Sequence, residues 1–156
     1  WVTGELGGAR AALTAWRAGR TPAPGARERF ARPVPRIEAG SGLARLGATA
    51  MLDLSDGLAG DATHLAAASG VALSIDLGLV PCHPAVAAEA RLLGVAPGLF
   101  AAVGGEDYEL LVAMPGAFQG SAGLDLTRIG VVSKGSGVEL LQDGVPVTAA
   151  GFDHFA

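Results

Sequence analysis

The sequence has a single cysteine, no long hydrophobic run and no cluster of basic residues. Cys82 stands alone among 156 residues, which excludes a disulfide within the chain and fits a protein of the reducing cytoplasm. No apolar stretch approaches the roughly 18 residues that a membrane helix needs, so we expect no membrane partner. The formal net charge of −4 and the scattered lysines and arginines argue against nucleic-acid binding.

The beginning of the chain also lacks familiar features. No basic segment followed by an apolar one is present, so no signal peptide is predicted. The chain starts at Trp1 rather than at a methionine, and we interpret it as a fragment of a longer protein.

What the sequence does contain is enough apolar material for one compact domain. Half of the residues are hydrophobic, which is sufficient for a core and argues against disorder. The 24 glycines indicate close packing and many tight turns.

The hydrophobic spacing predicts helices and strands in mixed order. Helices are expected at 8–20, 37–46, 57–69, 84–93 and 97–102, with a single helical turn at 27–30. Strands are expected at 48–54, 71–77, 108–114, 126–132, 138–141 and 145–147. Asp143-Gly144 predicts a hairpin turn before the last strand. The expected fold class is therefore α+β, a mixed, largely antiparallel sheet covered by helices.

A strand-to-helix corner at residues 53–58 carries the strongest chemical signal. Ser55 lies where the N-cap of the following helix is expected, and the exposed N–H groups of a first helical turn attract anions. Asp53 and Asp56 would repel a phosphate unless they hold Mg²⁺, which prefers oxygen ligands and bridges to phosphate. A purely structural interpretation has Ser55 capping the helix and Asp56 complementing its dipole, but it leaves Asp53 unexplained.

A second acidic segment, at residues 104–110, precedes a predicted strand. Two glycines open it, so its backbone is free to approach a ligand closely. Strand alternation divides its other residues between two faces: Glu106, Tyr108 and Leu110 on one, Asp107 and Glu109 on the other. The alternatives are a substrate-contacting carboxylate and a glycine turn with a solvated acidic strand start.

Together these segments resemble thiamine-monophosphate kinase, a family of the aminoimidazole-ribonucleotide synthetase superfamily. The resemblance runs along nearly the whole chain. The segments that carry it are Val2-Thr3-Gly4 with Leu6-Gly7, Arg32-Pro33-Val34-Pro35-Arg36, Asp53-Leu54-Ser55-Asp56-Gly57-Leu58, Ser69-Gly70-Val71, Val80-Pro81, Gly104-Gly105-Glu106-Asp107-Tyr108-Glu109-Leu110, Ile129-Gly130 and Gly151-Phe152-Asp153-His154-Phe155.

The resemblance implies that ATP phosphorylates thiamine monophosphate to thiamine diphosphate with the help of Mg²⁺. It implies that Asp53 and Asp56 are magnesium ligands and that Ser55 contacts ATP phosphate. It further implies that Glu106 and Phe152 contact the thiamine substrate, because a cationic thiazolium favours a carboxylate and an aromatic face.

The resemblance also implies that residues 1–156 are a single C-terminal domain. An N-terminal domain, absent from this chain, would carry most of the ATP and magnesium site and much of a homodimer contact. Two other interpretations remain: another enzyme of the superfamily, such as selenophosphate synthetase or aminoimidazole-ribonucleotide synthetase, and a non-catalytic nucleotide-binding or partner-binding module.

Three further groups are interpreted as structural. Asp61 and His64, three residues apart on the predicted helix 57–69, favour a surface or capping network over a metal pair. Arg32 and Arg36, next to prolines, are interpreted as surface anchors outside the site. Cys82 is interpreted as a small, partly buried thiol rather than a nucleophile.

Overall fold

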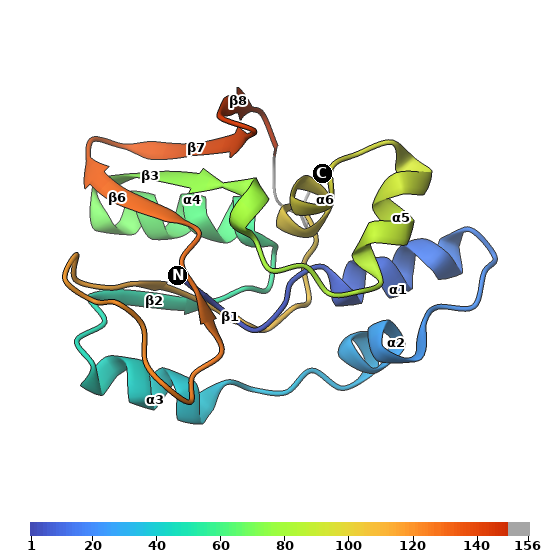
Figure 1. Cartoon of the computed structure of the whole chain (residues 1–156), viewed down its shortest axis with the longest axis horizontal. Helices are drawn as coiled ribbons and strands as arrows, with labels where there is room; N and C mark the ends of the chain where they lie inside the picture. Colours follow the sequence, from blue (N-terminus) through green and yellow to red (C-terminus); the bar gives the residue numbers. More distant parts are fainter. Residues whose placement is uncertain (150–156) are drawn as a thin grey trace.

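The computed structural model describes residues 1–149, which form two four-stranded sheets with helices around and between them (Figure 1). The first sheet has the order β2-β4-β1-β5, and every neighbouring pair in it is antiparallel. Its strands are β1 (Val2–Thr3), β2 (Ala50–Asp53), β4 (Leu110–Ala113) and β5 (Leu126–Thr127).

The second sheet has the order β6-β3-β7-β8 and contains one parallel pair, β3 with β7. Its strands are β3 (Val71–Asp76), β6 (Gly130–Lys134), β7 (Gly137–Gln142) and β8 (Val145–Val147). The predicted hairpin between β7 and β8 is present. Asp143 and Gly144 both have positive φ, at 52° and 78°, as a tight two-residue hairpin requires.

Six α-helices and one short 3₁₀ helix accompany the sheets within residues 1–149. They are α1 (Gly8–Arg17), α2 (Pro24–Ala31), α3 (Ile37–Arg45), α4 (Leu58–Ser69), η1 (Leu77–Leu79), α5 (Val86–Leu93) and α6 (Pro97–Ala102). None of them is long and apolar enough to cross a bilayer.

Helix α4 contacts strands of both sheets and joins them into one core. The apolar face predicted for this helix is buried: Leu58, Ala62, Leu65 and Ala66. A second cluster packs around Phe100 of α6, between helices α1 and α5. The α+β class and the largely antiparallel pairing are thus confirmed.

Two predicted elements differ from the structure in an informative way. The strand expected at 126–132 is two strands, β5 and β6, which belong to different sheets. Between them Ile129 is fully buried, and Gly130 lies so close to Ser74 that a Cβ would be 2.1 Å from its carbonyl oxygen. The helical turn expected at 27–30 is the longer helix α2, because Pro24 occupies its first turn instead of ending the previous element.

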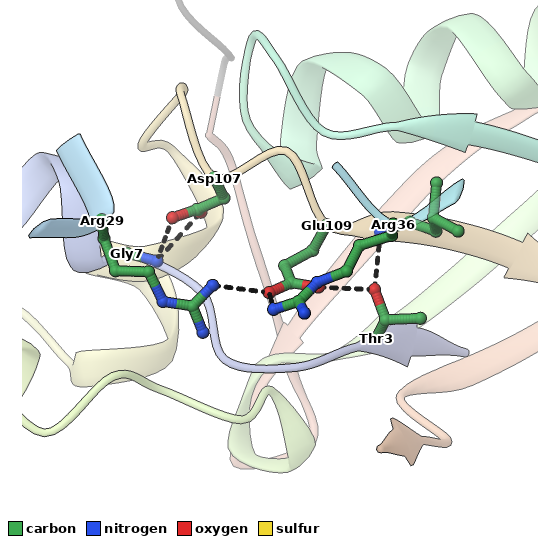
Figure 2. A network of polar contacts seen from close by, with 7 residues as sticks. Thr3, Gly7, Arg29, Arg36, Asp107 and Glu109 are labelled. Atoms are coloured by element: carbon green, nitrogen blue, oxygen red, sulfur yellow. Dashed lines mark hydrogen bonds and ion pairs between the residues drawn. The ribbon is translucent and has the colours of Figure 1, made fainter. Parts of the chain in front are cut away.

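A buried ionic cluster around Glu109 ties the α2–α3 segment to the first sheet (Figure 2). The Glu109 side chain is fully buried and accepts hydrogen bonds from Thr3 Oγ1 (2.6 Å) and Arg29 (2.8 Å). Arg36 donates to both carboxylate oxygens, at 2.7 and 2.5 Å. The interpretation of Arg36 as a surface anchor was therefore wrong, whereas Arg32 is exposed and lies 3.9 Å from Glu28.

Replacing Glu109 with glutamine should destabilise the protein strongly, because two arginines would then face a neutral group in a buried position. Removing one partner of a buried pair costs about 3–5 kcal/mol, and the lower end is expected because both arginines keep some solvent contact. Urea unfolding measures the change. The matched control is Glu28→Gln in the exposed pair, which should leave the free energy of unfolding unchanged. Equal losses in both variants would contradict this account.

Candidate functional site

The two acidic segments singled out in the sequence lie against each other through backbone hydrogen bonds. The N–H of Glu106 donates to the carbonyl of Ser55, and that of Tyr108 to the carbonyl of Leu54, both at 2.9 Å. The N–H of Leu54 donates in return to the carbonyl of Glu109 at 2.8 Å. Segments fifty residues apart thus form one continuous structural unit.

The pairing follows from the first sheet. Strands β2 and β4 are antiparallel with Asp53 opposite Leu110, so the chain leaving β2 runs beside the chain entering β4. The segment before β4 is not a regular strand, since Glu106 and Tyr108 have φ of 67° and 51°. These left-handed angles are uncommon for residues with side chains and are held here by the contacts with Leu54 and Ser55. The strand therefore begins at Leu110, two residues later than predicted.

Glycines make the close approach possible. A Cβ on Gly105 would lie 2.4 Å from the carbonyl oxygen of Ser55, and one on Gly57 would lie 2.8 Å from that of Gly104. Any side chain at these positions would push the two segments apart.

The structure places four of the five predicted site residues at this unit. Asp53 and Glu106 are exposed, whereas Ser55 and Asp56 are half-buried. The fifth, Phe152, lies outside the described residues. The burial pattern of the second segment agrees with the predicted alternation, since Asp107 and Glu109 are buried and Glu106 is not.

Tyr108 is hydrogen-bonded to one of the three predicted carboxylates and feels the charge of the other two. Its hydroxyl donates to Glu106 Oε2 at 3.1 Å, and this hydrogen bond raises the pKa of Tyr108. The negative charges of Glu106, Asp53 and Asp56 raise the pKa of the same hydroxyl further. The corner at residues 53–58 and the loop at residues 104–109 therefore form one acidic surface.

The structure corrects the role expected for Ser55 at the helix start. Helix α4 begins at Leu58, its N-cap is Gly57 with φ of 97°, and no side chain caps it. Asp61 in the first turn reaches back instead, and its carboxylate accepts the N–H of Asp56 at 3.0 Å. Asp61 thus stabilises the corner before the helix, and the side chain of Ser55 does not cap α4.

A cavity of about 820 Å³ adjoins the site between α1 and residues 103–106. One wall is the face of α1 that carries Ala9, Arg10, Leu13, Thr14, Arg17 and Ala18. The opposite wall consists of Ser55, Val103, Gly104, Gly105 and Glu106, and Phe30 and Leu93 complete the lining. An apolar lining with a few charged groups suits a small organic molecule that carries charges at its ends.

The α1 wall was not predicted from the sequence. Arg10 is half-buried, stacks 4.4 Å from the centroid of the Phe100 ring and donates to the Phe100 carbonyl at 2.6 Å. Arg17 is exposed at the other end of the same wall. The spacing of Arg10, Thr14 and Arg17 at i, i+4 and i+7 is the signal that could have placed them on one face.

A buried carboxylate joins the two walls of the cavity. Both oxygens of Asp107 accept the N–H of Gly7, the N-cap of α1, at 2.9 Å (Figure 2). The pKa of Asp107 is raised to about 7, because burial and the charge of Glu109 raise it more than the amides of Gly7 and Gly8 and the charge of Arg29 lower it. Asp107 is thus poised to change charge near neutral pH.

Cys82, near the same region, behaves as the sequence indicated. It is half-buried, and burial raises the pKa of its thiol, with further increases from Asp107 and Glu5. A raised pKa makes the thiol a poor nucleophile.

The donor set of the corner fits part of a magnesium site. Within residues 1–149 no group of three or more histidine, cysteine or acidic side chains is arranged to hold a metal. Two carboxylates, Asp53 and Asp56, are nevertheless what Mg²⁺ needs when phosphate oxygens and waters supply the remaining ligands. Oxygen donors and no sulfur or imidazole favour this hard cation over zinc.

Comparison with known proteins first defines a class. No protein-family model matches the chain. A solved structure described as E. coli HypE, a hydrogenase maturation protein, has a TM-score of 0.67 at 24% identity over 95% of this chain and 48% of its own, so the two share a fold. A structure described as AaThiL complexed with AMPPCP and TMP has a TM-score of 0.84 at 35% identity, over 99% of this chain and 50% of that one. The chain is therefore an α+β domain of the kind these proteins contain.

The sequence comparison is more specific. Thiamine-monophosphate kinase of Methanopyrus kandleri is 42% identical over 143 residues, which is 91% of this chain and 46% of that protein. The kinase of Escherichia coli K12 is 37% identical over 140 residues, which is 83% of this chain and 42% of that protein. The chain is thus homologous to part of thiamine-monophosphate kinase, and it spans about half the length of the curated relatives it matches.

Replacing Gly105 with alanine should separate the two segments of the site. The new Cβ would clash with the backbone of Ser55, and overpacking of this kind costs about 1–3 kcal/mol. Urea unfolding gives the loss. Gly42→Ala is the control, because its Cβ meets no atom and it lies within α3, where alanine is favoured by about 1 kcal/mol. A Gly105→Ala protein as stable as Gly42→Ala would contradict the close approach.

Asp107 should make stability fall as pH rises. Its folded-state pKa of about 7 exceeds the ordinary value of 3.8, so the folded chain binds a proton that the unfolded chain has lost. Between about pH 5 and pH 8 this group should remove about 3 kcal/mol of stability.

The measurement is the free energy of unfolding of wild type and Asp107→Asn in urea at both pH values. Other titrating groups are common to the two proteins and cancel in the difference. The wild type should lose stability relative to the variant as pH increases, and parallel pH dependences would refute the assigned pKa.

Proposed function

We propose that the protein to which this chain contributes transfers the γ-phosphoryl group of ATP to thiamine monophosphate, giving thiamine diphosphate and ADP. The observation that carries the proposal is the hydrogen-bonded unit of residues 53–58 and 104–110, in which the backbone of Glu106 bonds to Ser55, between Asp53 and Asp56. The similarity to thiamine-monophosphate kinases, and to a structure described as containing AMPPCP and TMP, supports the same reaction.

Each residue of the unit has a role that suits its chemistry. We assign Asp53 and Asp56 to magnesium, and Ser55, whose hydroxyl caps no helix, to a phosphate of ATP. Bound Mg²⁺ would neutralise phosphate charge, which is the main requirement of phosphoryl transfer. Without that neutralisation, the acidic surface of this chain would repel both phosphate-bearing substrates.

Glu106 is assigned to the thiamine end of the acceptor. Its carboxylate is exposed, lines the cavity and is oriented by the Tyr108 hydroxyl. A carboxylate stabilises the permanent positive charge of a thiazolium, and the apolar lining of Leu13, Leu93 and Val103 suits the uncharged parts of the molecule. Phe152 is proposed as an aromatic contact to the same substrate.

The other half of such a kinase would supply what this chain lacks. We propose that an N-terminal domain carries most of the magnesium ligands and much of the nucleotide site, and that residues 1–156 are the C-terminal domain. We further propose that the full-length protein is a homodimer of the cytoplasm that binds neither nucleic acid nor membrane. The isolated chain is expected to be inactive, since two carboxylates are too few for the metals of the reaction.

The kinase reaction is tested with the full-length protein by following ADP release from ATP, Mg²⁺ and thiamine monophosphate. Asp53→Asn and Asp56→Asn should each lower kcat by roughly 10²-fold or more, because lost charge neutralisation acts on the transition state. Glu106→Gln should chiefly raise the KM for thiamine monophosphate, since it removes a substrate contact. Asp76→Asn, in a surface turn outside the cavity, should match the wild type.

Parallel assays separate the alternatives. Turnover that depends on selenide or on the aminoimidazole-ribonucleotide precursor instead would identify another enzyme of the superfamily. Failure of the full-length protein to hydrolyse ATP with any acceptor would leave a nucleotide-binding or partner-binding module.

A further inference from the structure

One buried side chain, Asp107, connects the two segments that line the cavity. Helix α1 forms one wall, and the segment that ends in Glu106 forms the other. Asp107 directly follows Glu106, and its carboxylate accepts the N–H of Gly7, the N-cap of α1. Among the described hydrogen bonds, Asp107 thus links the loop to the first turn of α1.

We propose that Asp107 is a positioning residue, which fixes Glu106 relative to α1 and so sets the width of the cavity that receives the substrate. This inference rests on the proposed function, because it assigns the cavity to the phosphoryl acceptor. Asp107 is buried and lines no part of the cavity, so it acts through Glu106 and not on the substrate.

The backbone on either side of Asp107 supports this role. Glu106 and Tyr108 both hold left-handed φ angles, which L-residues leave readily unless the surroundings fix them. The loop is fixed on one side by the Leu54 and Ser55 carbonyls and on the other by Asp107. If the Asp107 contact were lost, the bonds to Leu54 and Ser55 would remain, but the described hydrogen bond that ties this segment to the start of α1 would be gone.

The charge state of Asp107 controls the strength of this contact. An ionised carboxylate offers two acceptor oxygens to the Gly7 N–H and complements the positive end of the α1 dipole. A protonated carboxyl keeps a single good acceptor and no charge. The groups that face Asp107 are Glu109, Arg29 of α2 and Cys82, and of these Glu109 disfavours the ionised form while Arg29 favours it.

The substrate assay uses the full-length enzyme. Asp107→Asn should raise the KM for thiamine monophosphate about tenfold near pH 8 while changing kcat little. A shift of Glu106 weakens substrate binding and leaves the phosphoryl-transfer step itself largely unchanged. Near pH 5.5 the wild-type group is itself protonated, so the KM ratio of variant to wild type should fall towards one. The substrate's own titration is the same in both proteins and cancels in the ratio.

A second readout needs no activity. In amide NMR spectra of the 156-residue chain, the Gly7 and Glu106 resonances should titrate together with a midpoint near 7, and Asp107→Asn should abolish both titrations. Asp76→Asn is the matched control, since Asp76 also accepts a backbone N–H, from Gly78, but lies outside the cavity lining. It should leave the titrations and the KM unchanged.

The outcomes separate this inference from the proposed function. A folded Asp107→Asn enzyme whose KM equals that of wild type at both pH values overturns the positioning role. So does a wild-type chain in which Gly7 and Glu106 do not titrate together, even if the variant fails to fold. A wild-type enzyme without thiamine-monophosphate turnover overturns the function instead, and the NMR titration then still decides whether Asp107 couples the loop to α1.

Discussion

The backbone hydrogen bonds between the Leu54–Ser55 corner and the Glu106–Tyr108 loop are the interaction on which the site depends. They link the two segments through backbone N–H and carbonyl groups and involve no side chains. The specificity comes from glycine, because the corner and loop approach too closely for a Cβ at Gly57 or Gly105. A site built in this way has its carboxylates at fixed positions before any ligand arrives, and preorganisation of that kind lowers the cost of binding.

Three buried carboxylates support that unit, and each is satisfied differently. Glu109 is surrounded by two arginines and a threonine hydroxyl, and it fastens the α2–α3 segment to the sheet. Asp107 accepts hydrogen bonds from backbone amides, and burial is the largest cause of its raised pKa. Asp61 accepts the N–H of Asp56 and so shapes the corner from within α4. The buried carboxylates thus stabilise the segments that carry the exposed carboxylates of the site.

Much of the fold and of the site was predictable from the sequence, since local patterns determined both. The helix at 97–102 and the apolar face of α4 follow from spacing, and the Asp143-Gly144 hairpin follows from turn chemistry. Asp53, Ser55 and Asp56 stood out because a carboxylate at the end of an apolar strand precedes the start of a helix, and Glu106 stood out through the resemblance to thiamine-monophosphate kinase.

What could not be predicted depended on contacts distant in sequence. Arg36 looks like a surface residue beside a proline until Glu109, 73 positions away, is placed opposite it. Gly57 replaced Ser55 as the N-cap because the corner must bend around Gly104. The division of residues 126–132 between two sheets likewise reflects the burial of Ile129, which no local pattern encodes.

The position of β1 has a consequence for how the protein is made. This strand comes first in the chain yet lies inside the first sheet, between β4 and β5. Val2 pairs with Leu111 and Thr127, so among residues 1–149 its partners follow it by more than a hundred positions. The corner can reach its loop only after the same delay. Non-local pairing of this kind slows folding. Until then the edges of β1 and β2 are unpaired, and unpaired strand edges are prone to wrong association.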